Sequence, residues 1–410
     1  MTDIPLTTRP FAVPTRPANL RVAGLGAALL ALGALWLAEA VSWRQAALFG
    51  VGSAMGLVLY HAQFGFTSAF RVFISDRRGA GLRAQMAMLA LAVLLFFPAL
   101  AAGSLFGVPV KGNVDPVGLS VLVGAFLFGI GMQLGAGCAS GTLYTVGGGS
   151  TRMVVTLFFF VAGSALGARH MDWWEATPHV PGISLLAELG LAPALILNLA
   201  VFGAIAGVTL VLEWWRHGGP APSARVTATG WRRALQGPWP LLAGALGLAV
   251  LHYATLALAG RPWGITSAFA LWGSKAVAAL GVDVASWPYW SAPARAAQLK
   301  TSLATDVTSV MDFGIMIGAL AAAGLADKFA PVWRIPLRSL LAAVVGGMLM
   351  GYGARLAYGC NIGAYFSGIA SASVHGWVWF AAALAGSYAG TLLRPLFGLI
   401  NERTPRQTGC

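Results

Sequence analysis

The 410-residue chain has few charged residues and very few cysteines. Only 10% of its residues are charged, compared with about 25% in soluble proteins, and 58% are hydrophobic. A soluble protein of this size needs far more charge to cover its surface, so the composition predicts a polytopic membrane protein. Cys138, Cys360 and Cys410 are too few for a disulfide framework. Neither Cys-x-x-Cys nor a histidine at ligand spacing accompanies them, so we expect no metal or cofactor.

Acidic residues are also scarce, with 13 Asp and Glu against 26 Lys and Arg and a formal net charge of +13. Such a basic excess can indicate nucleic-acid binding. The arginines, however, lie in short clusters between apolar runs, as they do in the cytoplasmic loops of membrane proteins. We therefore expect the protein to contact membrane lipid and to bind no nucleic acid. The stretch Met1–Leu20 lacks a short apolar core with a cleavage site, and we expect a cytoplasmic tail there rather than a signal peptide.

Ten apolar runs are long enough to cross a bilayer, which takes about 20 residues. They lie near residues 22–41, 46–64, 84–106, 117–136, 151–169, 190–212, 238–258, 306–325, 337–357 and 375–397. With both termini in the cytoplasm, the basic clusters fall in cytoplasmic segments. These clusters are Arg71, Arg77, Arg78 and Arg83; Arg216, Arg225, Arg232 and Arg233; Lys328, Arg334 and Arg338; and Arg403 and Arg406.

Two motifs each occur twice in the same order. Gly65-Phe66-Thr67-Ser68-Ala69-Phe70 recurs as Gly264-Ile265-Thr266-Ser267-Ala268-Phe269, and G-x-G-x-x-L-x-x-G-C ends at Cys138 and again at Cys360. Each Cys motif leads into a GxxxG pair, at Gly163 and Gly167 and at Gly386 and Gly390. An odd number of spans separates the copies, so we expect two inverted repeats, 46–170 and 238–397. A cytoplasmic linker, 214–236, joins them within one membrane transport domain, 1–410.

The glycine-rich motifs are expected to interrupt their helices. A break within a membrane survives only where protein or a polar cavity surrounds it, which predicts re-entrant half-helices with a cysteine at the tip. The amide-rich N-terminal ends of such half-helices attract an anion. The predicted substrate path comprises Cys138, Cys360, Gly137, Gly141, Thr142, Gly359, Asn361, Gly363, Gly65, Thr67, Gly264 and Thr266. The alternatives are that each thiol is a small apolar side chain and that the hydroxyls cap helices.

Ionisable residues near the spans are few. Lys275 and Arg355 are candidates for the path, because charges at membrane depth are expensive and often functional, although each could extend to an interface instead. We expect Arg71 and His375 to lie at interfaces. Asp312 falls toward the outer end of the eighth predicted span, and no string of Asp, Glu and His crosses the spans, which argues against a proton-coupled pump.

The paired motifs resemble those of the YeeE/YedE sulphur-transport family. The resemblance rests on Gly137-Cys138-Ala139-Ser140-Gly141-Thr142 with Gly147-Gly148-Gly149, and on Tyr358-Gly359-Cys360-Asn361-Ile362-Gly363 with Ser367-Gly368-Ile369 and His375-Gly376-Trp377. It covers nearly all of residues 46–397. It implies a non-enzymatic bacterial inner-membrane importer of thiosulfate, in which the anion passes central thiols by transient hydrogen bonds. It also implies a cytoplasmic TusA-like sulphur-carrier protein as a partner.

One departure from the family pattern concerns the first Thr-Ser-Ala-Phe motif. Thiosulfate transporters of the family carry Phe-Cys-Phe there, whereas this chain has Phe64-Gly65-Phe66. Three alternatives stay open: transport of another sulphur or selenium species, an intramembrane sulphurtransferase with a cysteine persulfide, and a docking platform that does not transport by itself. We expect the thiols of Cys138 and Cys360 to stay protonated, because apolar surroundings favour the neutral form.

Overall fold

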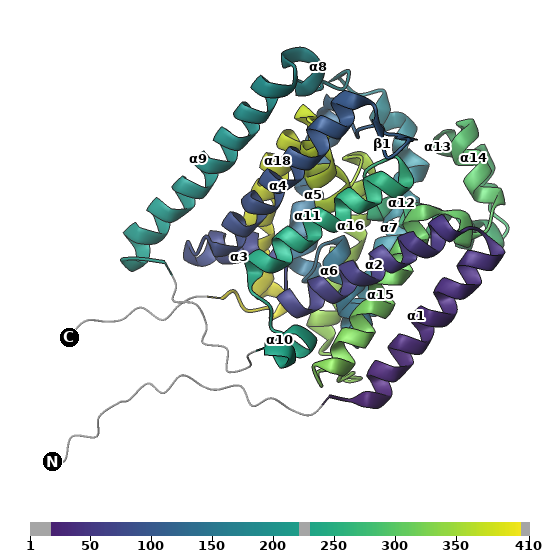
Figure 1. The fold of residues 1–410 in the computed structure, drawn as a ribbon, viewed down its shortest axis with the longest axis horizontal. Coiled ribbons are helices and arrows are strands. Elements are labelled where there is room, and N and C mark those ends of the chain that lie inside the picture. The colour runs from purple at the N-terminus through teal and green to yellow at the C-terminus, as the bar shows by residue number, and fades with distance from the viewer. Residues whose placement is uncertain (1–17, 221–229, 403–410) are drawn as a thin grey trace.

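The computed structural model describes residues 18–220 and 230–402, and this part of the chain forms one helical bundle (Figure 1). The predicted N-terminal tail up to residue 17, the middle of the predicted linker and Cys410 lie outside the described residues. Short strands occur only in connecting segments of the described part: β1 (Ser104–Leu105) pairs with β2 (Val108–Pro109), and β3 (Val117–Gly118) pairs with β4 (His179–Val180). The predicted all-α class is confirmed.

The helices of the first half are α1 (Leu20–Ala40), α2 (Trp43–Ala62), α3 (Phe66–Asp76), α4 (Ala80–Ala102), α5 (Leu119–Gly135), α6 (Ala139–Gly147) and α7 (Thr151–Glu175). Those that follow are α8 (Leu185–Leu189), α9 (Leu191–His217), α10 (Gly230–Gln236), α11 (Leu241–Ala259), α12 (Ile265–Ala279), α13 (Pro288–Ser291), α14 (Pro293–Lys300) and α15 (Val307–Leu325). The last are α16 (Leu337–Leu356), the π-helix η3 (Asn361–Phe366), α17 (Ser367–Ala370) and α18 (Val374–Leu393). Short 3-10 helices are η1 (Val284–Ser286), η2 (Leu303–Thr305) and η4 (Arg394–Phe397).

Ten of the described helical segments are long and apolar enough to cross a membrane, which confirms the predicted number of spans. Three of these segments are broken where the sequence predicts it: 43–76, 119–147 and 337–370. At each break a residue other than glycine adopts positive φ: Gln63 at 49°, Ala136 at 67° and Tyr358 at 56°. Such conformations are strained for L-residues, so the surrounding packing holds the breaks in place.

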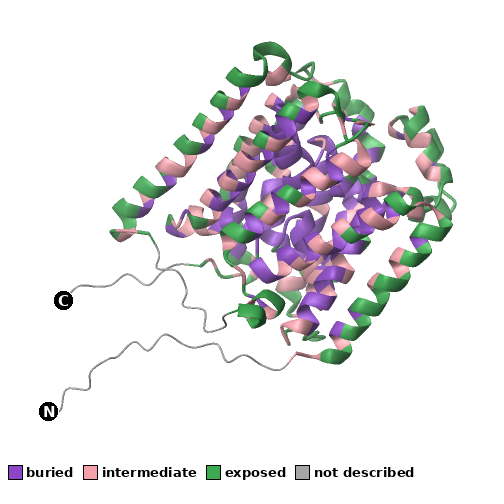
Figure 2. Cartoon of the chain, viewed as in Figure 1, coloured by how far each residue is buried: buried purple, intermediate pink, exposed green. Residues whose placement is uncertain are grey.

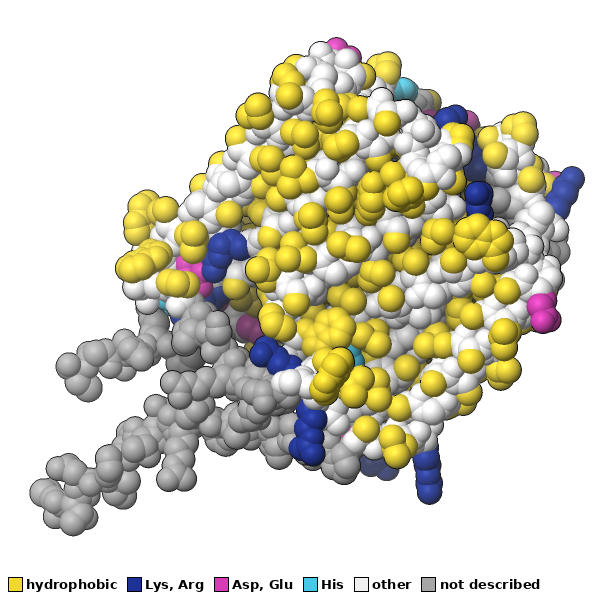
Figure 3. All heavy atoms as spheres, viewed as in Figure 1, with side chains coloured by type: hydrophobic (Ala, Val, Ile, Leu, Met, Phe, Trp, Pro, Cys, Tyr) yellow, Lys and Arg dark blue, Asp and Glu magenta, His cyan; other side chains and the backbone are white. Residues whose placement is uncertain are grey.

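The contacts between helices come in pairs. The contact of α7 with α16 has a counterpart in that of α18 with α5. In the same way, the contact of α2 with α15 corresponds to that of α11 with α4, and the contact of α1 with α15 corresponds to that of α9 with α4. α5 and α16 pack on each other at the centre, and the buried residues concentrate there (Figure 2). α1 and α9 lie at the edges and are exposed over most of their length (Figure 2). Apolar side chains cover most of the visible face, and Lys and Arg lie toward its rim (Figure 3).

Glycines allow the central helices to approach closely. A Cβ at Gly163 would overlap the Met348 carbonyl, and one at Gly386 would overlap the Phe126 carbonyl. At Gly167 the added atom would lie 2.7 Å from Cβ of Arg355. The two GxxxG pairs therefore form the contacts of α7 with α16 and of α18 with α5, as small residues do at helix interfaces in membranes.

A buried charge cluster attaches α9 to the bundle at the end nearest α10. The Glu213 carboxylate is fully buried, with Arg78 Nη1 at 3.2 Å and Arg83 Nη1 at 2.8 Å. An unpaired carboxylate is expensive to bury. The two arginines compensate the charge of Glu213, so that this residue can attach α9 to the bundle although the helix buries little apolar surface.

We expect Gly386→Val to destabilise the bundle by about 1–3 kcal/mol, because the added methyl groups force α18 away from α5. Gly203→Val on α9 is the matched control, since nothing lies within 4 Å of a Cβ at that position. Thermal unfolding of the purified protein in detergent measures both. Equal midpoints for the two variants would show that the α5–α18 contact is not tight.

Candidate functional site

Four helix N-termini gather at the centre of the bundle. α3, α6, α12 and η3 begin after Gly65, Cys138, Gly264 and Cys360, and none of these N-caps makes a side-chain capping hydrogen bond. α6, α12 and η3 contact one another. α3 joins them through Phe66, whose ring centroid is 6.1 Å from that of Tyr365. The free amides and aligned peptide dipoles of such helix ends favour negative charge.

The thiol of Cys138 lies at the start of α6 and is 1% exposed. Its Sγ is 3.4 Å from Oγ of Ser140 and close to the backbone of Phe66 and Gly141. The hydroxyl of Thr142 donates to the Cys138 carbonyl at 2.8 Å and so fixes the first turn. The thiol at the start of this half-helix is thus enclosed by backbone groups and one hydroxyl.

Cys360 occupies the corresponding place at the start of η3 and is fully buried. Its thiol lies near the backbone of Ile362 and Gly363 and within electrostatic range of Cys138. The indole of Trp379 donates to the Gly359 carbonyl at 3.2 Å and fixes the approach to this turn. Gly264 and Gly363 touch through their backbones, because a Cβ at Gly363 would lie 3.3 Å from Cα of Gly264.

Several buried polar atoms around these thiols have no hydrogen-bond partner within the described residues. They are Oγ1 of Thr67, both amide atoms of Asn361 and the hydroxyl of Tyr365. Thr67 and Asn361 belong to the predicted path, whereas Tyr365 does not. A tyrosine five residues after Cys360 could have been included on its position alone, since a buried hydroxyl needs a partner. The two hydroxyls and Nδ2 of Asn361 can donate hydrogen bonds to a polar ligand, and Oδ1 of Asn361 can accept one.

A chain of hydrogen bonds supports the site from the side of α10 and the described C-terminal residues. Gln133 Nε2 donates to the Thr67 carbonyl at 3.2 Å, and Arg71 Nη1 donates to Gln133 Oε1 at 3.5 Å. Arg71 also binds Glu402 at 2.6 and 2.5 Å, and these bonds lower the pKa of the Glu402 carboxyl. Arg71 is only 8% exposed, because it joins α3 to the last described residues of the chain, and its place at an interface stays a prediction.

The other predicted path residues lie in different surroundings. The Lys275 ammonium donates to the carbonyls of Leu299 and Thr301 at 2.6 and 2.8 Å, and Arg355 Nη1 donates to the Tyr289 hydroxyl at 2.8 Å. Both cations thus bond to the segment that contains α13 and α14. Thr266 is buried on α12, and Gly137 packs against Met153.

His375, for which the interface location stays a prediction, is fully buried within the protein. Its Nε2 lies 3.0 Å from the Ala357 carbonyl, and its Nδ1 lies 3.9 Å from the Asp115 carboxylate. Burial raises the pKa of Asp115. The loop 103–118 therefore closes over the second Cys motif, which the apolar pattern alone does not reveal.

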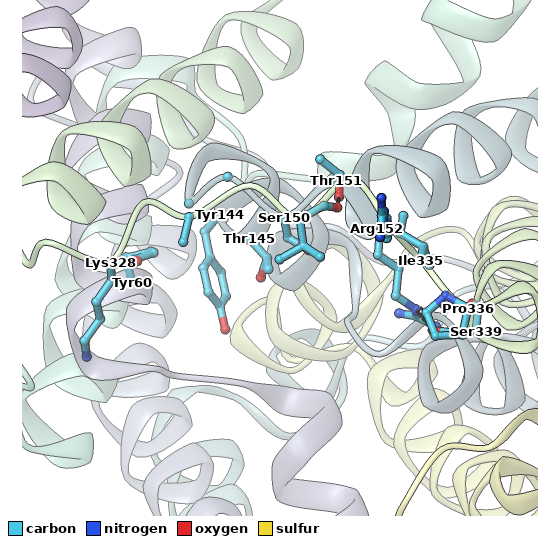
Figure 4. A pocket seen from close by; sticks show the side chains of 15 residues that line it. Tyr60, Tyr144, Thr145, Ser150, Thr151, Arg152, Lys328, Ile335, Pro336 and Ser339 are labelled. Carbon is cyan, nitrogen blue, oxygen red and sulfur yellow. Dashed lines mark hydrogen bonds between the residues drawn. The ribbon is translucent and has the colours of Figure 1, made fainter.

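A cavity of about 420 Å³ lies at the other end of α6 (Figure 4). Tyr60 and Tyr144 line it with Arg152, Lys328 and Arg334, and none of its described lining residues is acidic. Tyr144 is within electrostatic range of Cys138, so α6 connects the thiol to this basic cavity. A second cavity, of about 340 Å³, lies at the opposite end of α7 and is lined by Arg169, His170 and Asp172.

The fold and the site define a polytopic helical membrane protein with an enclosed centre lined by thiols and amides. The chain belongs to the sulphur transport family, whose profile matches residues 61–389.

Individual relatives support the same assignment. A protein named "Probable transporter YedE" of Escherichia coli (strain K12) is 31% identical over 163 residues, 39% of this chain and 39% of that protein. The thiosulfate transporter TsuA of Spirochaeta thermophila is 27% identical over 349 residues, 80% of this chain and 92% of that protein. TsuA of Escherichia coli (strain K12) is 24% identical over 365 residues, 83% of this chain and 92% of that protein. The chain thus spans about two fifths of YedE. The relatives are named transporters, in agreement with the expectation of a non-enzyme.

The bond between Glu402 and Arg71 predicts a pH-dependent stability. Since the pKa of Glu402 is lowered in the folded protein, its stabilisation is complete above the ordinary glutamate range and is lost as the pH falls through the folded-state pKa. We expect the thermal midpoint of Glu402→Gln to lie slightly below wild type at neutral pH. The effect is small, because the carboxylate is 52% exposed. The two midpoints should converge in acid, and a difference that grows with acidification would contradict the assignment.

Proposed function

We propose that the protein imports thiosulfate, or a closely related sulphur anion, through the bacterial inner membrane past Cys138 and Cys360. The observation that carries this proposal is the meeting of four uncapped helix N-termini around two buried thiols. Membership of the sulphur transport family and the likeness to TsuA support the choice of substrate.

The chemistry of the centre suits a dianion with a soft terminal sulphur. Helix N-termini stabilise its negative charge without a fixed cation, and no Lys or Arg among the described residues bonds to either thiol. Neutral thiols are weak donors, so they guide the anion without trapping it. Conduction requires such weak binding at successive positions.

Gly65 leaves the first Thr-Ser-Ala-Phe motif without a third thiol. A Cβ at Gly65 would lie 2.6 Å from Oγ of Ser68, which donates to the Gly65 carbonyl at 3.1 Å. We infer that the unpartnered hydroxyl of Thr67 and the amide of Asn361 replace the missing donor. Glycine at this position keeps the N-terminus of α3 accessible to the anion.

The paired helix contacts support an arrangement of two inverted repeats, 46–170 and 238–397, in one transport domain. The described basic residues near α10 favour a cytoplasmic location for that end and for both termini. The basic cavity at the end of α6 then opens to the cytoplasm, where a TusA-like sulphur-carrier protein would receive the anion. Lys275 and Arg355 bond to residues at the opposite end of the molecule. There they would attract anions toward the outer opening of the path.

Uptake of radiolabelled thiosulfate by proteoliposomes tests the proposal. We expect Cys138→Ala and Cys360→Ala each to reduce uptake at least tenfold, because each removes a central donor, whereas serine replacements retain a donor and lose less. Cys410→Ala is the control, since Cys410 lies in the polar C-terminal tail and outside the described residues.

The same assay separates the alternatives. Uptake at the parent rate by both alanine variants would refute passage along the thiols. No uptake by the purified parent chain would favour a docking platform. A persistent mass increase on either cysteine after exposure to thiosulfate would favour a persulfide-forming sulphurtransferase.

A further inference from the structure

Asp312 is a buried carboxyl that the path described so far does not use. It lies in the second turn of α15 and is fully buried. Neither of its carboxylate oxygens has a hydrogen-bond partner among the described residues. An ionised carboxylate in such surroundings is very costly, so the side chain has to bind a proton or a cation when it is enclosed.

The contacts of α15 place Asp312 beside the centre. Thr308, one turn before it, meets Ser267 of α12, with the two hydroxyl oxygens 3.3 Å apart. One turn after it, the Met316 backbone contacts Gly147 of α6. Residues four apart share a helix face, so Asp312 lies between α12 and α6, which both contact η3. It is also within electrostatic range of Cys360.

The described groups around Asp312 form no ion pair with it. Arg261, just before α12, donates to the Thr308 hydroxyl at 3.4 Å instead. Asp306, on the same helix, accepts hydrogen bonds from Ser309 and adds negative charge. Lys275 of α12 bonds to the carbonyls of Leu299 and Thr301 instead. The other ionisable side chains on described helices packed against α15 are Arg21 and Glu39 of α1, Arg44, Tyr60 and His61 of α2, Tyr144 of α6, and Arg232 and Arg233 of α10. None of them has a hydrogen bond or ion pair with Asp312 in the described structure.

We propose that Asp312 binds the proton that accompanies each sulphur anion across the membrane. The proposal rests on the transport function inferred above. It revises the expectation from the sequence that argued against proton coupling, because one buried carboxyl can bind a proton without a string of ionisable groups across the spans. A dianion near Cys360 is repelled by an ionised Asp312 and tolerated by a protonated one. The coupling is reciprocal, so a bound anion favours the protonated carboxyl. The proton is taken up outside as the carboxylate becomes a carboxylic acid, and it is released to the cytoplasm when the anion leaves.

A metal cation does not fit the same place. Hard cations take several oxygen ligands, and no group of three or more His, Cys, Asp or Glu that could hold a metal occurs within the described residues. The nearest hydroxyls on the helix are engaged, since Thr308 meets Ser267 and Ser309 accepts the indole N–H of Trp272 at 2.8 Å. The carboxyl therefore takes a proton.

Proteoliposomes loaded with a pH-sensitive dye provide the test, with the membrane potential clamped by potassium and valinomycin. We expect radiolabelled thiosulfate uptake by the wild type to acidify the lumen. A pH gradient that is acidic outside should raise accumulation about tenfold per pH unit for one proton per anion. Asp312→Asn, which is neutral at every pH, should still equilibrate thiosulfate but should neither move protons nor respond to the gradient.

Asp306→Asn is the matched control, because asparagine also caps a helix, and it should keep the response of the wild type. Wild-type uptake without lumen acidification overturns the proposal even if Asp312→Asn fails to fold. A wild-type response to a sodium gradient instead of a pH gradient also overturns it. Thiosulfate accumulation by Asp312→Asn that still increases with the pH gradient also overturns the proposal. Absence of any thiosulfate uptake by the wild type, by contrast, refutes the transport function itself.

Discussion

A polypeptide backbone that leaves helical geometry inside a membrane has to be enclosed by protein, because lipid offers its amides and carbonyls no partner. Three of the ten spans break in this way, and the rest of the structure follows from the need to cover the breaks. α5 and α16 pack directly at the centre, and glycines bring α7 and α18 against them. The helices that bury least, α1 and α9, lie at the edges, where their apolar side chains can meet lipid.

The enclosed breaks interrupt the hydrogen bonding of the helices, and they also place helix N-termini inside the protein. No N-cap side chain bonds to the amides at the starts of α3, α6, α12 and η3. The thiols sit at the starts of α6 and η3, so soft donors and amides occupy the same small volume. Under the proposed function, such a centre attracts an anion without a permanent cation.

Much of this arrangement could be predicted from the sequence. Hydropathy indicated the ten spans, and repeated glycine motifs indicated the breaks and the close helix contacts, because both effects depend on local residue types. Depth along a span, however, does not say which neighbour surrounds a side chain. Arg71 and His375 are buried because distant segments, Glu402 and the loop with Asp115, cover them. The place of Tyr365 beside the site depends on the contact between Phe66 of α3 and Tyr365 of η3, which the sequence does not reveal.

The uncapped helix starts have a consequence for how such a protein can vary. Under the proposed function, the attraction for an anion resides in main-chain amides, which a side-chain substitution leaves in place as long as the turns keep their shape. A side chain at Gly264 or Gly363, whose backbones touch, would instead push the two helix starts apart. The few side chains that do face the anion are free to set which anion is accepted. Substrate preference can therefore diverge among relatives while the permeation route stays the same.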